Sequence, residues 1–156
     1  MAPGLTEAPP APGPRRVCID ALNLAYWCGE PPSLRMPMTA MAHLLAGGHQ
    51  ALLYFDASAR YRLGDEAELY GQLIRHSRHC IEVPSGRAAD SVMLRQATAD
   101  GACILSRDKY RDHRRRYRRL IDDPLRLIPG EVEADRLRVP GLGMDVALAA
   151  TVGEAW

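Results

Sequence analysis

Two aspartates, Asp108 and Asp112, lie directly after an apolar run at residues 102–105. If the segment that carries them is helical, their carboxylates share one face of the helix and repel each other. A divalent cation bound between them would turn this repulsion into an attraction. The alternative needs no cation, because Asp108 can cap a helix and Asp112 can pair with Arg116.

Apolar segments that alternate with segments of helical periodicity must position these aspartates. Buried strands are expected at residues 15–20, 51–55, 80–83, 102–105 and 125–128, and helices at 38–45, 66–76 and 88–99. This alternation predicts an α/β fold in which helices flank a parallel central sheet. Beyond residue 137 the sequence predicts an edge strand and a short helix at 145–150.

Ligand sites of parallel sheets lie beyond the carboxyl ends of the strands, and four acids fall there. Asp20 and Asp108 follow strands, Asp90 opens a helix, and Asp112 comes one helical turn after Asp108, so one pocket is expected to hold all four. Each has a structural alternative, such as a turn cap at Asp20 or an N-cap at Asp90. Asp56 ends another strand and is expected nearby but farther out.

Crowded carboxylates take up protons or bind a cation, so the pKa of the most buried acid is expected to rise. A donor set of oxygens, without clustered Cys or His, favours Mg²⁺ or Mn²⁺ over zinc. Such an ion activates water for attack on a phosphodiester. No P-loop, dinucleotide-binding fingerprint or nucleophile elbow offers a different chemistry.

Basic residues gather between Arg107 and Arg119, although the net charge of the chain is only +1. Beside an acidic metal pocket they would contact nucleic-acid phosphates without reading sequence. The residues expected to bind substrate through charge are Arg87, Arg107 and Arg111.

The chain has 156 residues, which fits one domain, here expected at 15–156. Residues 1–14 carry five prolines and predict a disordered leader. No apolar run of about 18 residues indicates a membrane span. The four cysteines show no zinc spacing, and three of them lie in strand-like runs. Reduced thiols and a cytoplasmic location are therefore expected.

Three segments resemble the NYN branch of the PIN-like nucleases, and most closely the nuclease domain of CCCH zinc-finger endoribonucleases. They are Val17–Asn23, Val83–Gly86 leading to Ala89–Asp90, and Ile104–His113. The resemblance implies a PIN-like three-layer fold and metal-dependent, usually endonucleolytic, cleavage of RNA. It also implies that Asp20, Asp90, Asp108 and Asp112 are the metal-site acids and that Asn23 and Ser106 lie on the substrate side.

The sequence departs from the family pattern in two ways. Ala89 stands where relatives often carry a second acid, which bears on the number of metal ions, and no zinc finger is present. Two other functions therefore stay open, namely a catalytically weak PIN-like domain that binds RNA or a protein partner, and a nuclease that acts on DNA. A homodimer and a protein inhibitor are further partners to consider, and a membrane is not expected.

Overall fold

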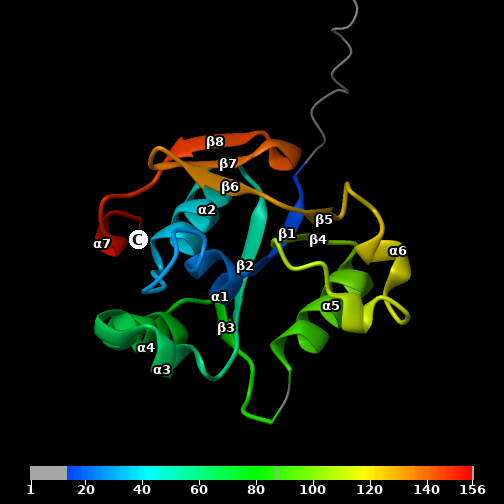
Figure 1. Cartoon of the computed structure of the whole chain (residues 1–156), viewed down its shortest axis with the longest axis horizontal. Coiled ribbons are helices and arrows are strands. Elements are labelled where there is room, and N and C mark those ends of the chain that lie inside the picture. Colours follow the sequence, from blue (N-terminus) through cyan, green and yellow to red (C-terminus); the bar gives the residue numbers. More distant parts are fainter. Residues whose placement is uncertain (1–13, 87, 156) are drawn as a thin grey trace, which may run out of the picture.

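Five short parallel strands form the central sheet of this α/β domain (Figure 1). The computed structural model describes residues 14–86 and 88–155. Within them the strand order is β3-β2-β1-β4-β5. The strands are β1 (Arg16–Asp20), β2 (Gln50–Phe55), β3 (Cys80–Glu82), β4 (Cys103–Leu105) and β5 (Leu127–Ile128). The five predicted strands and their parallel pairing are confirmed, with bounds that shift by one or two residues.

Strand β1 lies at the centre of the sheet, because β2 pairs with one of its edges and β4 with the other. Val17 is in register with Ala51 of β2 on one side and with Cys103 of β4 on the other. The chain runs outward from β1 through β2 to β3 and then returns to place β4 and β5 beyond the other edge of β1. The strand order therefore switches between β1 and β4, where a parallel sheet opens a crevice at its carboxyl end.

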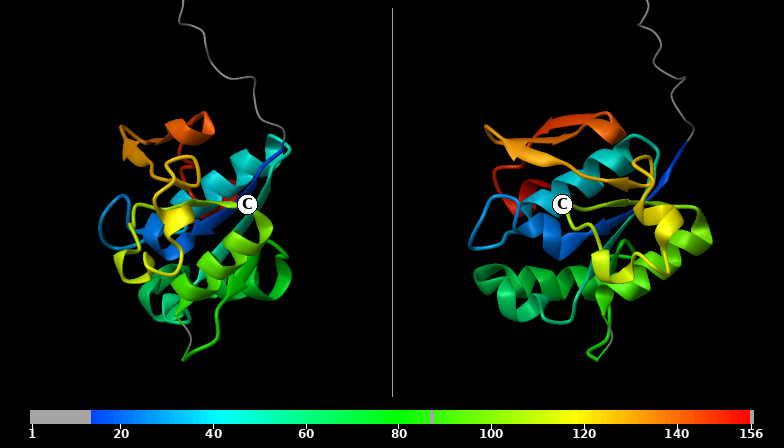
Figure 2. Two further views of the ribbon diagram at one scale, coloured as in Figure 1. Left: turned by 90° about the vertical axis from the view of Figure 1, so that its right-hand side faces the viewer. Right: turned by 45° about the vertical axis from the view of Figure 1, so that its right-hand side comes forward.

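Helices cover both faces of this sheet, as two further views make clear (Figure 2). They are α1 (Ala21–Ala25), α2 (Arg35–Ala46), α3 (Ala59–Arg62), α4 (Ala67–His76), α5 (Ala89–Asp100), α6 (Arg118–Ile121) and α7 (Val152–Ala155). Successive side chains of β1 point to opposite faces. Val17 and Ile19 therefore pack with α1, α2 and α4, whereas Cys18 packs with α5 and α6.

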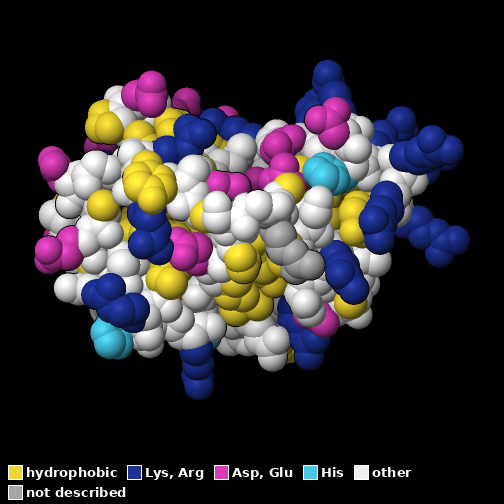
Figure 3. Space-filling model, turned by 90° about the horizontal axis from the view of Figure 1, so that it is seen from below, with side chains coloured by type: hydrophobic (Ala, Val, Ile, Leu, Met, Phe, Trp, Pro, Cys, Tyr) yellow, Lys and Arg dark blue, Asp and Glu magenta, His cyan; other side chains and the backbone are white. Residues whose placement is uncertain are grey.

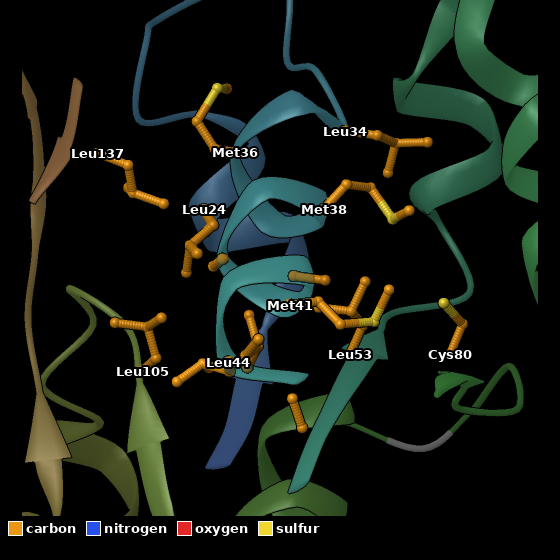
Figure 4. Close-up of a cluster of buried hydrophobic side chains, with 14 of the residues drawn as sticks. Leu24, Leu34, Met36, Met38, Met41, Leu44, Leu53, Cys80, Leu105 and Leu137 are labelled. Carbon is orange, nitrogen blue, oxygen red and sulfur yellow. The ribbon is translucent and has the colours of Figure 1, made fainter. Parts of the chain in front are cut away.

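Methionine-rich helix α2 fills the larger of the two cores (Figure 4). Met36, Met38 and Met41 are buried there, and Leu53 of β2 lies beside Met41. Unbranched methionine side chains fill irregular space between elements of different shape. Here they pack α2 against the sheet, which fixes the position of β1 and of the loop that follows it.

A second sheet follows the first, and it corrects one prediction. Strands β6 (Glu131–Glu133), β7 (Arg136–Val139) and β8 (Met144–Ala147) pair antiparallel in that order. The strand expected from residue 137 is present as β7, but it is the middle strand of this sheet and not an edge, and the helix expected at 145–150 is wrong. Gly143, with a φ of +64°, turns the chain so that Met144 pairs with Val139. Burial of both residues in the larger core favours the strand.

Two further expectations concern the ends of the chain and the membrane. The proposed leader at residues 1–14 falls almost wholly on residues 1–13, which lie outside the described residues. In the part of the chain that the structure describes, no helix has the length and apolar character to cross a bilayer.

The four cysteines are free, and three of them, Cys18, Cys80 and Cys103, are buried.

Candidate active site

Asp20 is the last residue of β1 and carries its carboxylate to the carboxyl end of the sheet. Its Oδ2 accepts hydrogen bonds from Ser106 Oγ at 3.1 Å and from the Tyr110 hydroxyl at 2.5 Å. The pKa of Asp20 is raised to about 6, mainly by burial and to a smaller extent by the charge of Asp90, while the hydrogen bonds from Tyr110 and Ser106 oppose the rise. The expected rise in pKa is therefore present, but desolvation is its largest cause and crowding a smaller one.

The loop after β4 holds Asp108 through its own side chains. Ser106, which is buried, accepts a hydrogen bond from the Asp108 N–H at 3.0 Å. Asp108 Oδ1 in turn accepts one from the Tyr110 N–H at 2.7 Å. Tyr110 has a left-handed φ of +50°, so a helix through residues 108–112 is wrong. Ser106 thus connects Asp20 to Asp108.

Asp90 comes from a third segment, the first turn of α5, and it is half-buried. It does not cap the helix, because Ala88 occupies the N-cap position. Burial raises the pKa of Asp90, and the charge of Asp108 raises it further, while His113 lowers it. The effect of Asp108 on Asp90 agrees with their position, because both residues line a common space.

That space is a cleft of about 360 Å³ at the carboxyl end of the sheet. Its walls are Asp20, Leu22, Asn23, Tyr26, Asp56, Ser58, Arg62, Ala89, Asp90 and Asp108. Seen from below, acidic side chains gather near the middle of the molecule, with many Lys and Arg side chains toward the right edge (Figure 3). Larger hollows exist elsewhere, including one of about 460 Å³ at the opposite end of the strands, but this cleft contains the carboxylates.

The positions of Asp56 and Asp112 differ from those predicted: Asp56 lines the cleft and Asp112 does not. Asp56, expected farther out, lines the cleft, where its Oδ1 accepts the Ser58 N–H at 2.8 Å. The Ser58 hydrogen bonds lower the pKa of Asp56. Asp112 is exposed in a short 3₁₀ helix, Arg111–His113, and does not line the cleft. The left-handed turn at Tyr110 separates Asp112 from Asp108.

The donors in the cleft fit a hydrated Mg²⁺ or Mn²⁺. Asp20, Asp90 and Asp108 offer only oxygen, and burial disfavours the charge on the first two. Within residues 14–86 and 88–155, no three Asp, Glu, His or Cys side chains approach closely enough to surround an ion on their own. Mg²⁺ does not require this, since it commonly keeps several waters and takes one or two carboxylates.

A cluster of Asn23, Trp27 and Arg107 holds the same loop from the other side. Asn23 Oδ1 accepts hydrogen bonds from Trp27 Nε1 at 2.9 Å and from the Arg107 N–H at 3.0 Å. The Arg107 guanidinium stacks 4.5 Å from the centre of the Trp27 ring and donates to the Gly130 carbonyl at 2.7 Å. In these contacts the side-chain oxygen of Asn23 and the guanidinium of Arg107 stabilise the loop.

A second cleft, of about 870 Å³, adjoins the first and shares Asp108 with it. Its basic lining residues are Arg107, Lys109, Arg111 and Arg114. Arg114 is held by Asp122 through two hydrogen bonds of 2.8 and 2.9 Å, whereas Lys109 and Arg111 are exposed. Arg87, also expected to bind substrate, lies outside the described residues.

Sequence reasoning missed Tyr110, Trp27, Tyr26, Ser58 and Arg62. Trp27 follows Asn23 by four residues, a spacing that places two side chains on one helical face, so this pair had a signal. The sequence signal for Tyr110 is weaker, because it consists only of an aromatic residue within a charged stretch. The others reach the cleft from segments whose order in the sequence gives no indication of their position.

No curated protein sequence matches the chain. Two solved structures of the Arabidopsis thaliana nuclear protein-only RNase P 2 (PRORP2) resemble it in fold, with TM-scores of 0.63 and 0.60 and 15% sequence identity. Each match covers 89% of this chain but only 31% or 32% of the other, so the chain spans about a third of that protein's length. The likeness confirms the expected PIN-like fold. Residues 13–141 match the Zc3h12a-like Ribonuclease NYN domain, and the chain belongs to this family.

Proposed function

We propose that this ribonuclease domain depends on Mg²⁺ or Mn²⁺ and hydrolyses internal phosphodiester bonds of RNA. The observation that supports the proposal most is the meeting of Asp20, Asp90 and Asp108 in one cleft. They come from the end of β1, the start of α5 and the loop after β4, which is the switch point of the sheet. Three acids from three distant segments at this point are what a metal-assisted hydrolase needs.

Asp20, Asp90 and Asp108 are the residues that would hold the ion. When bound, it would polarise a phosphoryl oxygen and make water a stronger nucleophile at neutral pH. Asp20 is kept in one orientation by Ser106 and Tyr110, so its carboxylate needs little rearrangement to act. Asp56 lies at the wall of the same cleft, and the role of Asp112, which lies outside it, is a separate question.

RNA would reach the acids through the larger basic cleft. Lys109 and Arg111 project from the segment that carries Asp108, so phosphates held by them would lie beside the acids. Their charge offsets the repulsion between a polyanion and the acidic cleft. Such contacts position the strand and leave sequence choice to other features.

Cleavage assays with purified protein test the proposal. Linear RNA, circular RNA and DNA of one sequence should be incubated with Mg²⁺, with Mn²⁺ and with EDTA, alongside the Asp108→Asn variant. We expect cleavage of linear and circular RNA with either metal, none with EDTA, and a loss of at least about a hundredfold in the variant. Cleavage that persists in EDTA would contradict the metal dependence, and resistance of circular RNA would contradict the endonucleolytic mode.

A second function is favoured by one specific feature, Ala89, which leaves the cleft with one carboxylate fewer than relatives often have. A domain of this kind could bind RNA and cleave it poorly. Equal RNA binding and equally low cleavage by the parent and Asp108→Asn would support that alternative. Homodimer formation, a protein inhibitor and a cytoplasmic location stay predictions from the sequence.

A further inference from the structure

Tyr26, Ser58 and Arg62 form a polar wall of the acidic cleft that no part of the proposed chemistry uses. Arg62 ends α3, and its side chain is held at two points. Its Nε donates to Ser58 Oγ at 3.1 Å and its Nη1 to the Tyr26 hydroxyl at 3.3 Å. A long side chain fixed in this way loses less freedom when it binds a ligand.

The wall is anchored to the sheet beneath it. Asp56, directly after β2, accepts the Ser58 N–H at 2.8 Å through its side chain and the Ala59 N–H at 2.9 Å through its carbonyl. Ala59, the first residue of α3, and Leu63, which directly follows the helix, are buried in the larger core. The position of Arg62 is therefore set by the same strand end that contributes Asp56 to the cleft.

Arg62 keeps unused binding capacity. Ion pairs within the described part of the chain do not include it, and its side chain is exposed. Of the described residues that line the cleft, it is the only Lys or Arg, against four aspartates. A guanidinium has five N–H donors in a planar fork that matches phosphate oxygens, and the two contacts here leave most of them free.

We propose that Arg62, positioned by Tyr26 and Ser58, binds a backbone phosphate of the RNA on the side of the acids away from the basic cleft. The inference rests on the proposed function and adds a substrate contact to it. A strand that crosses Asp108 meets Lys109 and Arg111 on one side and Arg62 on the other. The site therefore takes RNA with phosphates on both sides of the cut, and short RNA that ends at the cut loses the Arg62 contact.

Binding measurements test this contact without cleavage. Fluorescence anisotropy of a labelled single-stranded RNA should be recorded at several salt concentrations with Asp108→Asn as the non-cleaving parent. We expect Arg62→Ala in this background to bind about tenfold more weakly and to reduce the slope of log K against log salt by about 0.7. Arg62→Gln, which keeps the side-chain stem and a donor, checks that the loss is not one of folding. Tyr26→Phe, which releases one end of Arg62, should lose about two- to threefold.

Arg95→Ala is the matched control, because Arg95 is an exposed arginine on α5 that lines neither cleft. It should bind as the parent does. Equal affinity and equal salt slope for the Arg62 variants and the parent would overturn the proposal, as would an equal loss with Arg95→Ala.

Kinetics separate this inference from the proposed function. In the otherwise unchanged protein, Arg62→Ala should raise KM about tenfold and change kcat less than threefold. If the protein fails to cleave RNA but Arg62→Ala weakens binding, the phosphate contact stands and the nuclease proposal fails. If the protein cleaves RNA and Arg62→Ala keeps the parent KM, the contact is wrong and the nuclease proposal stands.

Discussion

Tyr110 donates a hydrogen bond from its hydroxyl to Oδ2 of Asp20, which lies 90 residues earlier in the chain. Tyr110 is buried and Asp20 is partly buried, and the bond favours the charged carboxylate against the desolvation that raises its pKa. The turn that orients Tyr110 is the one in which its N–H binds Asp108. Tyr110 therefore lowers the pKa of Asp20 through its hydroxyl and helps to position Asp108 through its N–H.

Replacing Tyr110 with Phe should shift the acid limb of the pH–rate profile. The change removes a hydrogen bond that lowers the pKa of Asp20, so this pKa should rise above its value of about 6. If cleavage needs the carboxylate, kcat/KM at pH 6 should fall more than kcat/KM at pH 8. The measurement is the full pH profile of kcat/KM, with Tyr117→Phe as a control outside both clefts. An unshifted acid limb would count against a role for Asp20 in its charged form.

Asp20→Asn should make the protein more stable at neutral pH. The folded pKa of about 6 lies above the ordinary value of 3.8, so folding binds this proton more tightly. Stability from Asp20 is thus present at low pH and is lost as the pH rises from about 4 to about 6. The variant should gain about 1–3 kcal/mol at pH 8 and nothing at pH 3.5, as measured by urea unfolding without divalent ions.

Asp122→Asn is the opposite case and serves as its control. The hydrogen bond from Arg114 lowers the pKa of Asp122, so its carboxylate favours the folded state at neutral pH. This variant should not gain stability at pH 8. A gain equal to that of Asp20→Asn would show a general effect of lowering negative charge rather than relief of buried charge.

Most of the sheet could be predicted because its strands are short apolar runs bounded by acids and turns. Asp20 and Asp108 could be predicted to approach each other for the same reason, since parallel strands bring their carboxyl ends to one edge. The course of the chain after Asp108 could not, because charged residues from Arg111 to Arg119 carry no hydrophobic period. The buried tyrosine at position 110, with its left-handed backbone, decides that course.

The second sheet was missed for a related reason. The composition of residues 145–150, which include three alanines and a leucine, favours a short helix. Pairing with β7 and burial of Met144 and Leu148 in the larger core outweigh that local preference. Tertiary contacts commonly override helix propensity in segments this short.

Asp108→Asn and Asp112→Asn should differ sharply in activity. Both residues are exposed, but Asp108 lines both clefts whereas Asp112 lines neither. Loss of the Asp108 charge should lower kcat about a hundredfold or more, while the loss with Asp112→Asn should be tenfold or less. Single-turnover cleavage at saturating RNA and Mg²⁺ measures both. Equal losses would mean that Asp112 acts at the site, as the sequence predicts.

Asn23 should prove to be a positioning residue whose carbonyl oxygen is the part that matters. Asn23→Ala leaves the buried Trp27 Nε1 and the Arg107 N–H without their acceptor. An unsatisfied buried donor costs about 1–3 kcal/mol, whereas the N–H of the exposed Arg107 can bind water instead, so the variant should lose about 1–3 kcal/mol in urea unfolding. The loop that carries Asp108 would loosen, so kcat should fall about tenfold or more with little change in RNA affinity. Asn23→Asp keeps an acceptor at the same place and should restore most of the stability. If Asn23→Asp were as unstable as Asn23→Ala, the two hydrogen bonds would not account for the role of this residue, and a contact from its amide group to the RNA would be the better explanation.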